Sequence, residues 1–156
     1  MTATDIRRSA IDAHEETWQL LDKRGRTLAE DEAMMAAARL SLEHWAEVGT
    51  TVNAQRGHWL VARAAVDAGL AEPALEHAER TLALTADQPD GLQDFDFAFA
   101  QEVAARAFAL VGDTSRAARH YAKAKRLGEA IEKEGDRKEF FRQFALGPWF
   151  GLDSPA

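Results

Sequence analysis

The chain has 156 residues, of which 46% are hydrophobic and 29% are charged, and its net charge is −7. These values are typical of one globular domain and exclude a disordered chain. The absence of cysteine excludes disulfides, thiolate zinc sites and cysteine nucleophiles. The negative charge argues against nucleic acid as a partner. With no signal-peptide pattern and no run of ~18 apolar residues, we expect a cytoplasmic protein that binds no membrane.

Seven helices are predicted, because apolar residues recur at three- and four-residue spacings and no segment alternates like a strand. Capping boxes at Thr27 with Glu30 and at Asp136 with Glu139 mark two helix starts, and Pro73 lies in the first turn of another. We therefore expect a single all-α domain over residues 1–156. The predicted helices cover about residues 4–24, 27–49, 50–69, 72–85, 93–111, 113–134 and a short segment from residue 136.

An internal repeat relates the middle helices at an offset of 43 residues. Repeated helical hairpins are typical of a solenoid, in which each unit buries its apolar face against its neighbour. The two units cover about residues 52–88 and 93–134. A stack of this kind presents an extended groove, so the repeat favours binding over catalysis. The identical pairs are Ala62/Ala105, Arg63/Arg106, Ala64/Ala107, Gly69/Gly112, Ala74/Ala117 and His77/His120.

Small, aromatic and glycine residues follow a fixed order in the second unit, namely Ala105, Phe108, Gly112, Ala117, Tyr121 and Ala124. This order resembles the tetratricopeptide (TPR) family of helical repeats, and the chain is similar to bacterial TPR-like proteins that imply no enzymatic activity. The resemblance covers about residues 52–134. It implies a stack of antiparallel hairpins with a C-terminal capping helix. The 43-residue period exceeds the family's ~34 residues, which implies longer helices or connections.

In the TPR family the first helix of each unit lines a concave groove. Arginine binds carboxylates through paired hydrogen bonds, and tryptophan supplies an apolar anchor. We therefore expect an interaction or adaptor module that binds an acidic or carboxylate-bearing peptide segment. The resemblance places these residues in the groove: Asn53, Arg56, Trp59 and Arg63 from the third helix, and Phe99, Glu102 and Arg106 from the fifth.

A structural interpretation of the same residues stays open. Glu102 lies four residues before Arg106, a spacing that permits a salt bridge on one helix, and it is also a candidate partner of Arg63 across helices. Trp59 is then part of the core. In this interpretation the stripe stabilises the fold and binds nothing.

A small-molecule sensor or minor enzyme is the alternative function, with Asp94, Asp96 or His58 acting in the same polar groove. The two aspartates and Glu102 also offer oxygen ligands for a hard cation, but they lack the spacing of an EF-hand. The chain contains no HExxH, P-loop or GxSxG motif. We expect no enzymatic activity, no cofactor and no bound metal.

Five aromatic residues near the carboxyl terminus form the last conspicuous feature. A stack needs its final apolar face covered, so we favour a capping helix whose tail folds back. An exposed aromatic cluster instead predicts a homodimer interface. The residues are Phe140, Phe141, Phe144, Trp149 and Phe150.

Overall fold

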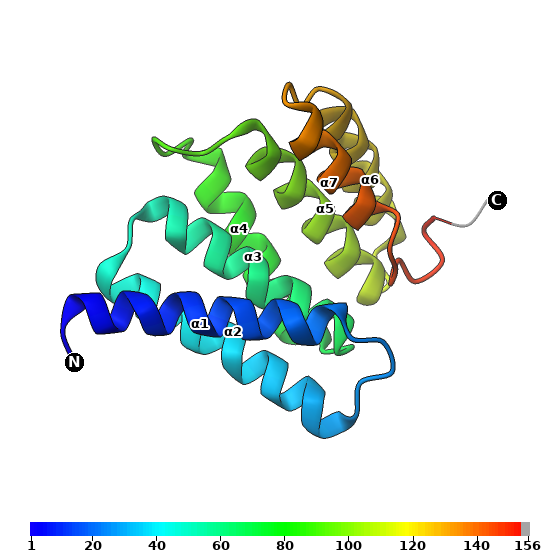
Figure 1. Ribbon diagram of the computed structural model, residues 1–156. Coiled ribbons are helices and arrows are strands. Elements are labelled where there is room, and N and C mark those ends of the chain that lie inside the picture. The colour runs from blue at the N-terminus through cyan, green and yellow to red at the C-terminus, as the bar shows by residue number, and fades with distance from the viewer. Residues whose placement is uncertain (154–156) are drawn as a thin grey trace.

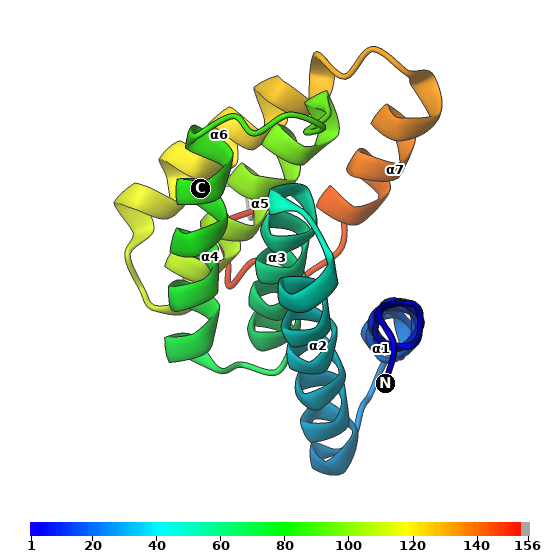
Figure 2. The same cartoon turned by 90° about the vertical axis from the view of Figure 1, so that its left-hand side faces the viewer.

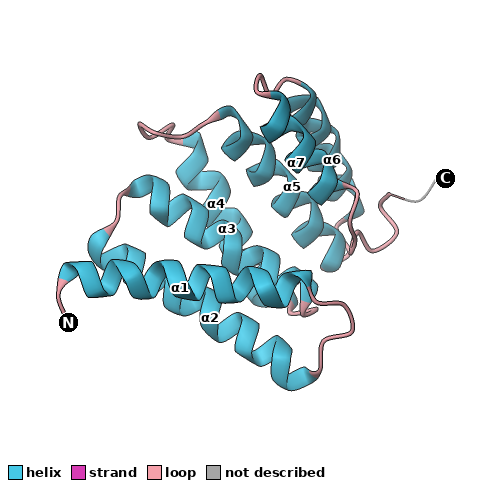
Figure 3. Ribbon diagram, viewed as in Figure 1, coloured by secondary structure: helices cyan, strands magenta, loops and turns pink. Residues whose placement is uncertain are grey.

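The computed structural model describes residues 1–153, and within them the chain forms seven α-helices and no strand (Figures 1 and 3). Among these residues, no helix combines the length and the apolar character needed to cross a membrane. The all-α prediction is confirmed. The helices are α1 (Ala3–Asp22), α2 (Leu28–Val48), α3 (Thr51–Asp67), α4 (Ala71–Ala86), α5 (Asp94–Leu110), α6 (Thr114–Glu129) and α7 (Glu134–Phe144).

Consecutive helices from α1 to α6 pack on one another in antiparallel order, and α7 folds back onto α5 and α6. Figure 2 shows the resulting layers: α3 and α5 lie in the middle, α4 and α6 lie on one side, and α1 and α7 lie on the other. The first and last helices do not contact each other. They therefore form two separate walls beside the same pair of central helices.

The two repeat units end their first helices with the same turn. In α3, Leu70 donates its backbone N–H to the carbonyl of Ala65 at 2.8 Å, and in α5 the equivalent Asp113 donates to Phe108 at 2.9 Å. The intervening Gly69 and Gly112 adopt φ of 73° and 85°, a region in which a side chain is strained. The repeat read from the sequence therefore corresponds to a repeated backbone geometry.

Alanine makes the central helices pack closely. The alanines that recur in the repeat are fully buried, so the backbones of neighbouring helices can approach one another closely. This is the physical reason why the repeat preserves alanines more than large residues. The fully buried alanines of α3 and α5 include Ala62, Ala64, Ala65, Ala104, Ala105 and Ala107.

The boundary between the last two helices differs from the prediction. Helix α6 ends at Glu129 and not near residue 134, and α7 begins at Glu134, two residues before the predicted cap at Asp136. The buried Ile131 anchors the intervening chain in the core, and Arg137 donates to its carbonyl at 2.8 Å. This tertiary contact breaks the helix where the local sequence alone favours its continuation.

The aromatic cluster at the carboxyl terminus mostly covers the end of the stack. Phe140, Phe144 and Trp149 are buried and belong to one core cluster with α5 and α6 residues. Phe150 is the most exposed of the five, at 45%. This packing agrees with the capping interpretation, and the homodimer stays a prediction.

Replacing Phe140 with alanine tests this capping role. We expect Phe140→Ala to lower the free energy of unfolding by about 3–5 kcal/mol, because a fully buried ring leaves a cavity. Phe150→Ala is the matched control and should change stability by less than about 0.5 kcal/mol. Urea unfolding followed by circular dichroism measures both, and equal losses would show that the cluster does not act as a cap.

Candidate functional site

Figure 2 shows α1 and α7 on the same side of α3 and α5. A cleft lies between these two walls, with α3 along its floor and α5 contributing to the floor at one end. It contains two cavities. We call the first the aromatic pocket; its volume is about 220 Å³. Its lining residues are His14 and Trp18 of α1, Gln55, Arg56 and Trp59 of α3, Phe95, Asp96 and Phe99 of α5, and Glu139 and Gln143 of α7.

The second cavity, which we call the basic pocket, has a volume of about 620 Å³. It follows the same two walls and the same floor helix toward the carboxyl end of α3. Five of its lining side chains are cationic and two are carboxylates. The lining includes Asp22, Lys23, Arg24 and Arg26 from the end of α1 and the following turn, Arg63 and Asp67 of α3, and Arg142 of α7.

Stacked rings build the aromatic pocket. The ring centroids of Trp18 and Trp59 are 5.7 Å apart in a stacked arrangement, and Phe99 meets Trp59 edge-on at 5.4 Å. The indole N–H of Trp59 donates to the carbonyl of Phe99 at 3.0 Å. The polar atom of this tryptophan is therefore satisfied within the fold, and what it offers to a ligand is its apolar surface.

Arg56 supplies the one guanidinium of the aromatic pocket. Its Nε and Nη2 donate to the two carboxylate oxygens of Asp96 at 3.0 and 2.8 Å, and its carbon Cζ lies 5.4 Å from the centroid of the Phe95 ring. These hydrogen bonds to Asp96 raise the pKa of Arg56. The side chain is 41% exposed, and Nη1 has no hydrogen-bond partner among the described residues. One donor of Arg56 is therefore available to a ligand.

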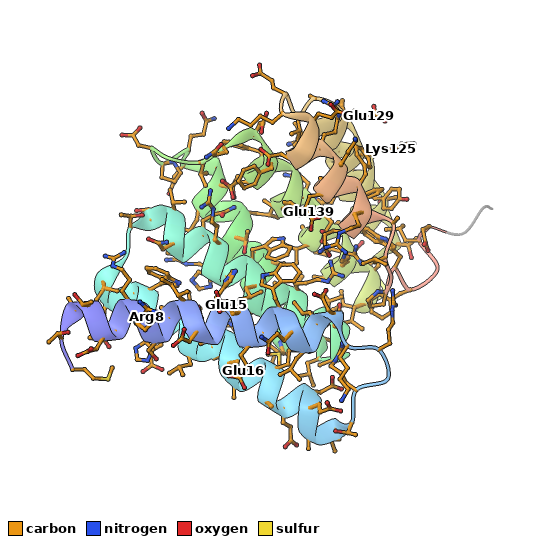
Figure 4. All side chains as sticks on the ribbon, in the orientation of Figure 1. Arg8, Glu15, Glu16, Lys125, Glu129 and Glu139 are labelled. Carbon is orange, nitrogen blue, oxygen red and sulfur yellow. The ribbon has the colours of Figure 1, made fainter. Side chains whose placement is uncertain are left out.

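The rim of the aromatic pocket carries mixed polar groups. Burial lowers the pKa of His14, so this imidazole is neutral at pH 7. Glu139 lies on the α7 wall (Figure 4), where hydrogen bonds from Arg142 lower its pKa and keep it ionised. Gln55 donates to Thr85 at 3.0 Å, which leaves its buried Oε1 without a donor. The pocket thus combines apolar walls with an unpaired donor on Arg56 and an unpaired acceptor on Gln55.

Arg106 is fully buried and does not line either pocket. Its Nε donates to Glu102 at 2.9 Å, and its two Nη atoms donate to the carbonyls of Gln143, Leu146 and Pro148 at 2.9–3.1 Å. All three nitrogen atoms therefore have partners. This geometry fits the structural interpretation of the residue, because the guanidinium ties α5 to the end of α7 and to the chain that follows it.

The structure divides the residues that the sequence analysis placed in one groove. Arg56, Trp59 and Phe99 line the aromatic pocket, and Arg63 lines the basic pocket. Three others do not line the cleft. Asn53 accepts the backbone N–H of Thr50 at the start of α3, and Glu102 is buried beneath the floor with Arg106.

Sequence reasoning missed both walls of the cleft. The sequence analysis named neither Trp18 nor Gln143 as a site residue. The α1 wall lies outside the repeat, so the TPR resemblance gave no reason to place it against the groove. The α7 wall depends on how the chain folds back after α6, and local periodicity carries no information about that return.

The chain matches no family model, and its comparison with curated proteins and with solved structures also gave no match. Within residues 1–153, no group of three histidine, aspartate or glutamate side chains is placed to hold a metal ion. The site is therefore interpreted from its own geometry.

Removing the buried guanidinium tests its structural role. We expect Arg106→Met to lower the free energy of unfolding by about 3–5 kcal/mol, because Glu102 and three carbonyls lose a buried donor. Arg116→Met is the control, since Arg116 is exposed on α6, and should cost less than about 0.5 kcal/mol. Chemical unfolding in the absence of any partner measures the difference. A small effect at Arg106 would contradict the structural assignment.

A histidine pair joins the two helices of the first repeat unit. His58 of α3 and His77 of α4 approach through their Nδ1 atoms at 2.9 Å. The equivalent positions of the second unit hold Gln101 and His120, whose Oε1 and Nδ1 are 2.6 Å apart. The repeat therefore preserves a side-chain hydrogen bond but changes one partner. Burial, assisted by the positive charge of nearby His77 and Arg80, lowers the pKa of His58 to about 4.

The lowered pKa of His58 predicts that the free energy of unfolding depends on pH. In the unfolded chain His58 binds a proton below about pH 6.5, but in the folded protein only below about pH 4. Stability is therefore lost as the pH falls between these values. Because the ring is only partly buried, solvent screening reduces its share of the loss at pH 5 to about 1 kcal/mol. We expect His58→Gln, which copies the second unit, to diminish the loss by that amount.

Thermal unfolding at pH 7.5 and pH 5 measures the effect. The reciprocal variant Gln101→His installs a histidine pair in the second unit and should enlarge the loss at pH 5. If both variants lose as much stability as the parent chain, the pair does not couple folding to pH.

Proposed function

We propose that this protein is an interaction module of TPR-like architecture whose cleft binds a partner segment carrying an acidic group beside an apolar side chain. One observation carries the proposal. Arg56, Trp59 and Arg63 follow one another on a single face of α3; Arg56 and Trp59 line the aromatic pocket, and Arg63, one turn further along, lines the basic pocket. A short peptide lying along α3 would meet both.

The chemistry of the aromatic pocket favours a side chain as its occupant. Its volume of about 220 Å³ is below the ~300–1,000 Å³ typical of small-molecule sites. Apolar contact with Trp18 and Trp59 would supply an anchor of the kind that dominates peptide interfaces. Arg56 Nη1 and Gln55 Oε1 would pair with a backbone carbonyl and a backbone N–H of the same segment, which fixes its direction.

The TPR-like assignment is supported by the two hairpins α3–α4 and α5–α6, which share an offset of 43 residues and the same glycine turn. In this assignment α3 and α5 are the groove-lining first helices, and they form the floor of the cleft. The cysteine-free composition supports a reducing compartment, and we place the protein in the cytoplasm on that basis.

A small-molecule sensor or minor enzyme is the second candidate, and the size of the basic pocket favours it. At about 620 Å³, this cavity falls within the range of small-ligand sites. Of the residues proposed for this role, Asp96 is already paired with Arg56, and His58 belongs to the histidine pair. An anionic ligand held by the arginines is therefore the form of this candidate that the geometry supports.

Peptide selection tests the proposed function directly. A random peptide library displayed on phage is selected against the immobilised protein, and the affinity of enriched peptides is measured by fluorescence polarisation. We expect enriched sequences to combine an acidic residue with a large apolar residue. Trp18→Ala should weaken their binding at least 10-fold, which corresponds to about 1.4 kcal/mol.

Trp45→Ala is the matched control, because Trp45 of α2 lies outside both pockets and packs against Arg7. Each variant is first shown to retain its helical signal and its unfolding temperature. Equal affinity of the two tryptophan variants, or the absence of any enriched sequence, would refute the peptide-binding function.

A further inference from the structure

We infer that the basic pocket binds an oxyanion, namely a carboxylate or phosphate group. Arg63 anchors this anion, and Arg24 and Arg142 contact it at the entrance of the pocket. The inference deepens the proposed function, because it names the chemistry that one end of the cleft recognises. It also stands without a peptide, since a small anion alone can occupy this end.

The anchor is a buried donor without a partner. The Arg63 side chain is 5% exposed, and its Nε donates to Asp67 at 3.0 Å. Its Nη1 has no hydrogen-bond partner. The nearest carboxylate oxygen, Glu102 Oε2, is 3.7 Å away, too far for a hydrogen bond, and it also has no partner. Both of these atoms are enclosed, so the group that Arg63 offers to the basic pocket is Nη2, which has no hydrogen-bond partner among residues 1–153 and would donate to an anion.

The other cationic side chains of the basic pocket differ in whether they already form ion pairs. Lys23 pairs with Glu30, and Arg26 pairs with Asp31 and with the carboxylate of Asp67. Arg24 is exposed and forms no hydrogen bond or ion pair within residues 1–153.

Arg142 is bound to Glu139 in an exposed pair on α7, a kind of pair that is worth little in water. Arg24 and Arg142 are therefore the two cations free to turn toward an anion.

Two features of the basic pocket oppose the binding of an anion. The basic pocket lies where α1, α3 and α7 end, and the negative ends of helix dipoles disfavour an anion. However, Arg26 donates to the terminal carbonyls of α1, and Arg106 donates to those of α7. These two guanidiniums offset the dipoles.

The second feature is the pair of lining carboxylates. Asp67 is held by Arg63 and Arg26. Asp22 is exposed and acts at a distance on Arg142, whose pKa it helps to raise. Asp22 therefore competes with a ligand for Arg142 only weakly, because solvent and salt screen its exposed charge.

The test is a titration with inorganic phosphate, with N-acetylglycine and with its amide, at constant ionic strength. Binding is followed by the NMR signal of the Arg63 Nε–H group and by the unfolding temperature. We expect saturable binding of at least one oxyanion and none of the amide. A preference for phosphate identifies a phosphorylated ligand, and a preference for N-acetylglycine identifies a peptide carboxylate; either outcome supports the inference.

Two matched double variants distinguish binding at the basic pocket from non-specific attraction of the oxyanion to positive charge. Arg24→Gln/Arg142→Gln should weaken oxyanion binding at least 10-fold. Arg116→Gln/Arg119→Gln removes the same charge from exposed positions of α6, where Arg116 has an i,i+3 ion pair with Asp113 as Arg142 has with Glu139. This control should leave binding unchanged. Equal weakening in both, or shifts that do not saturate, would overturn the inference.

The same titration separates this inference from the proposed function. Trp18→Ala removes a wall of the aromatic pocket and should abolish peptide binding while oxyanion binding persists. Loss of oxyanion binding in this variant would show that the basic pocket is not an independent site.

Discussion

The buried guanidinium of Arg106 is the interaction on which the cleft depends. Placing a charge in the core is costly unless it is paired and hydrogen-bonded. Each nitrogen atom of Arg106 has a partner, because the chain after α7 lies against α5. Its carbon Cζ also lies 3.9 Å from the centroid of the Trp149 ring, which closes the end of the stack. This constraint acts together with the buried rings of Phe140 and Phe144 to hold α7 against α5.

The two repeat units share a backbone but use equivalent positions differently. Arg63 and Arg106 occupy the same place in the repeat, and both contact Glu102, yet only Arg63 lines a cavity. The difference comes from what covers each unit. Helix α7 and the following turn pack against the second unit and bury its arginine. Helix α1 packs against the first unit but does not contact α7. Duplication thus supplied one structural arginine and one arginine with a free donor.

Sequence reasoning recovered the helices and the floor of the site because both depend on local patterns. Capping boxes, glycine turns and the period of 3.6 residues fixed the elements, and the stripe through Arg56 and Trp59 follows from helical spacing alone. The α1 and α7 walls of the cleft could not be predicted from the sequence. Whether Arg106 faces a groove or the core depends on how α7 returns, and that return depends on contacts between residues about 40 positions apart. Such contacts leave no signal in a single sequence.

The separation of α1 from α7 has a thermodynamic consequence. The walls of the cleft belong to opposite ends of the chain, and no direct packing joins them, although the charge of Asp22 acts on Arg142 across the gap. A molecule bound between them would act as a cross-link that the covalent structure lacks. Hydrogen exchange in the first and last helices, which do not pack on each other in the free protein, would then become more strongly correlated. Binding of a molecule in the cleft would change the cooperativity of unfolding without changing the fold.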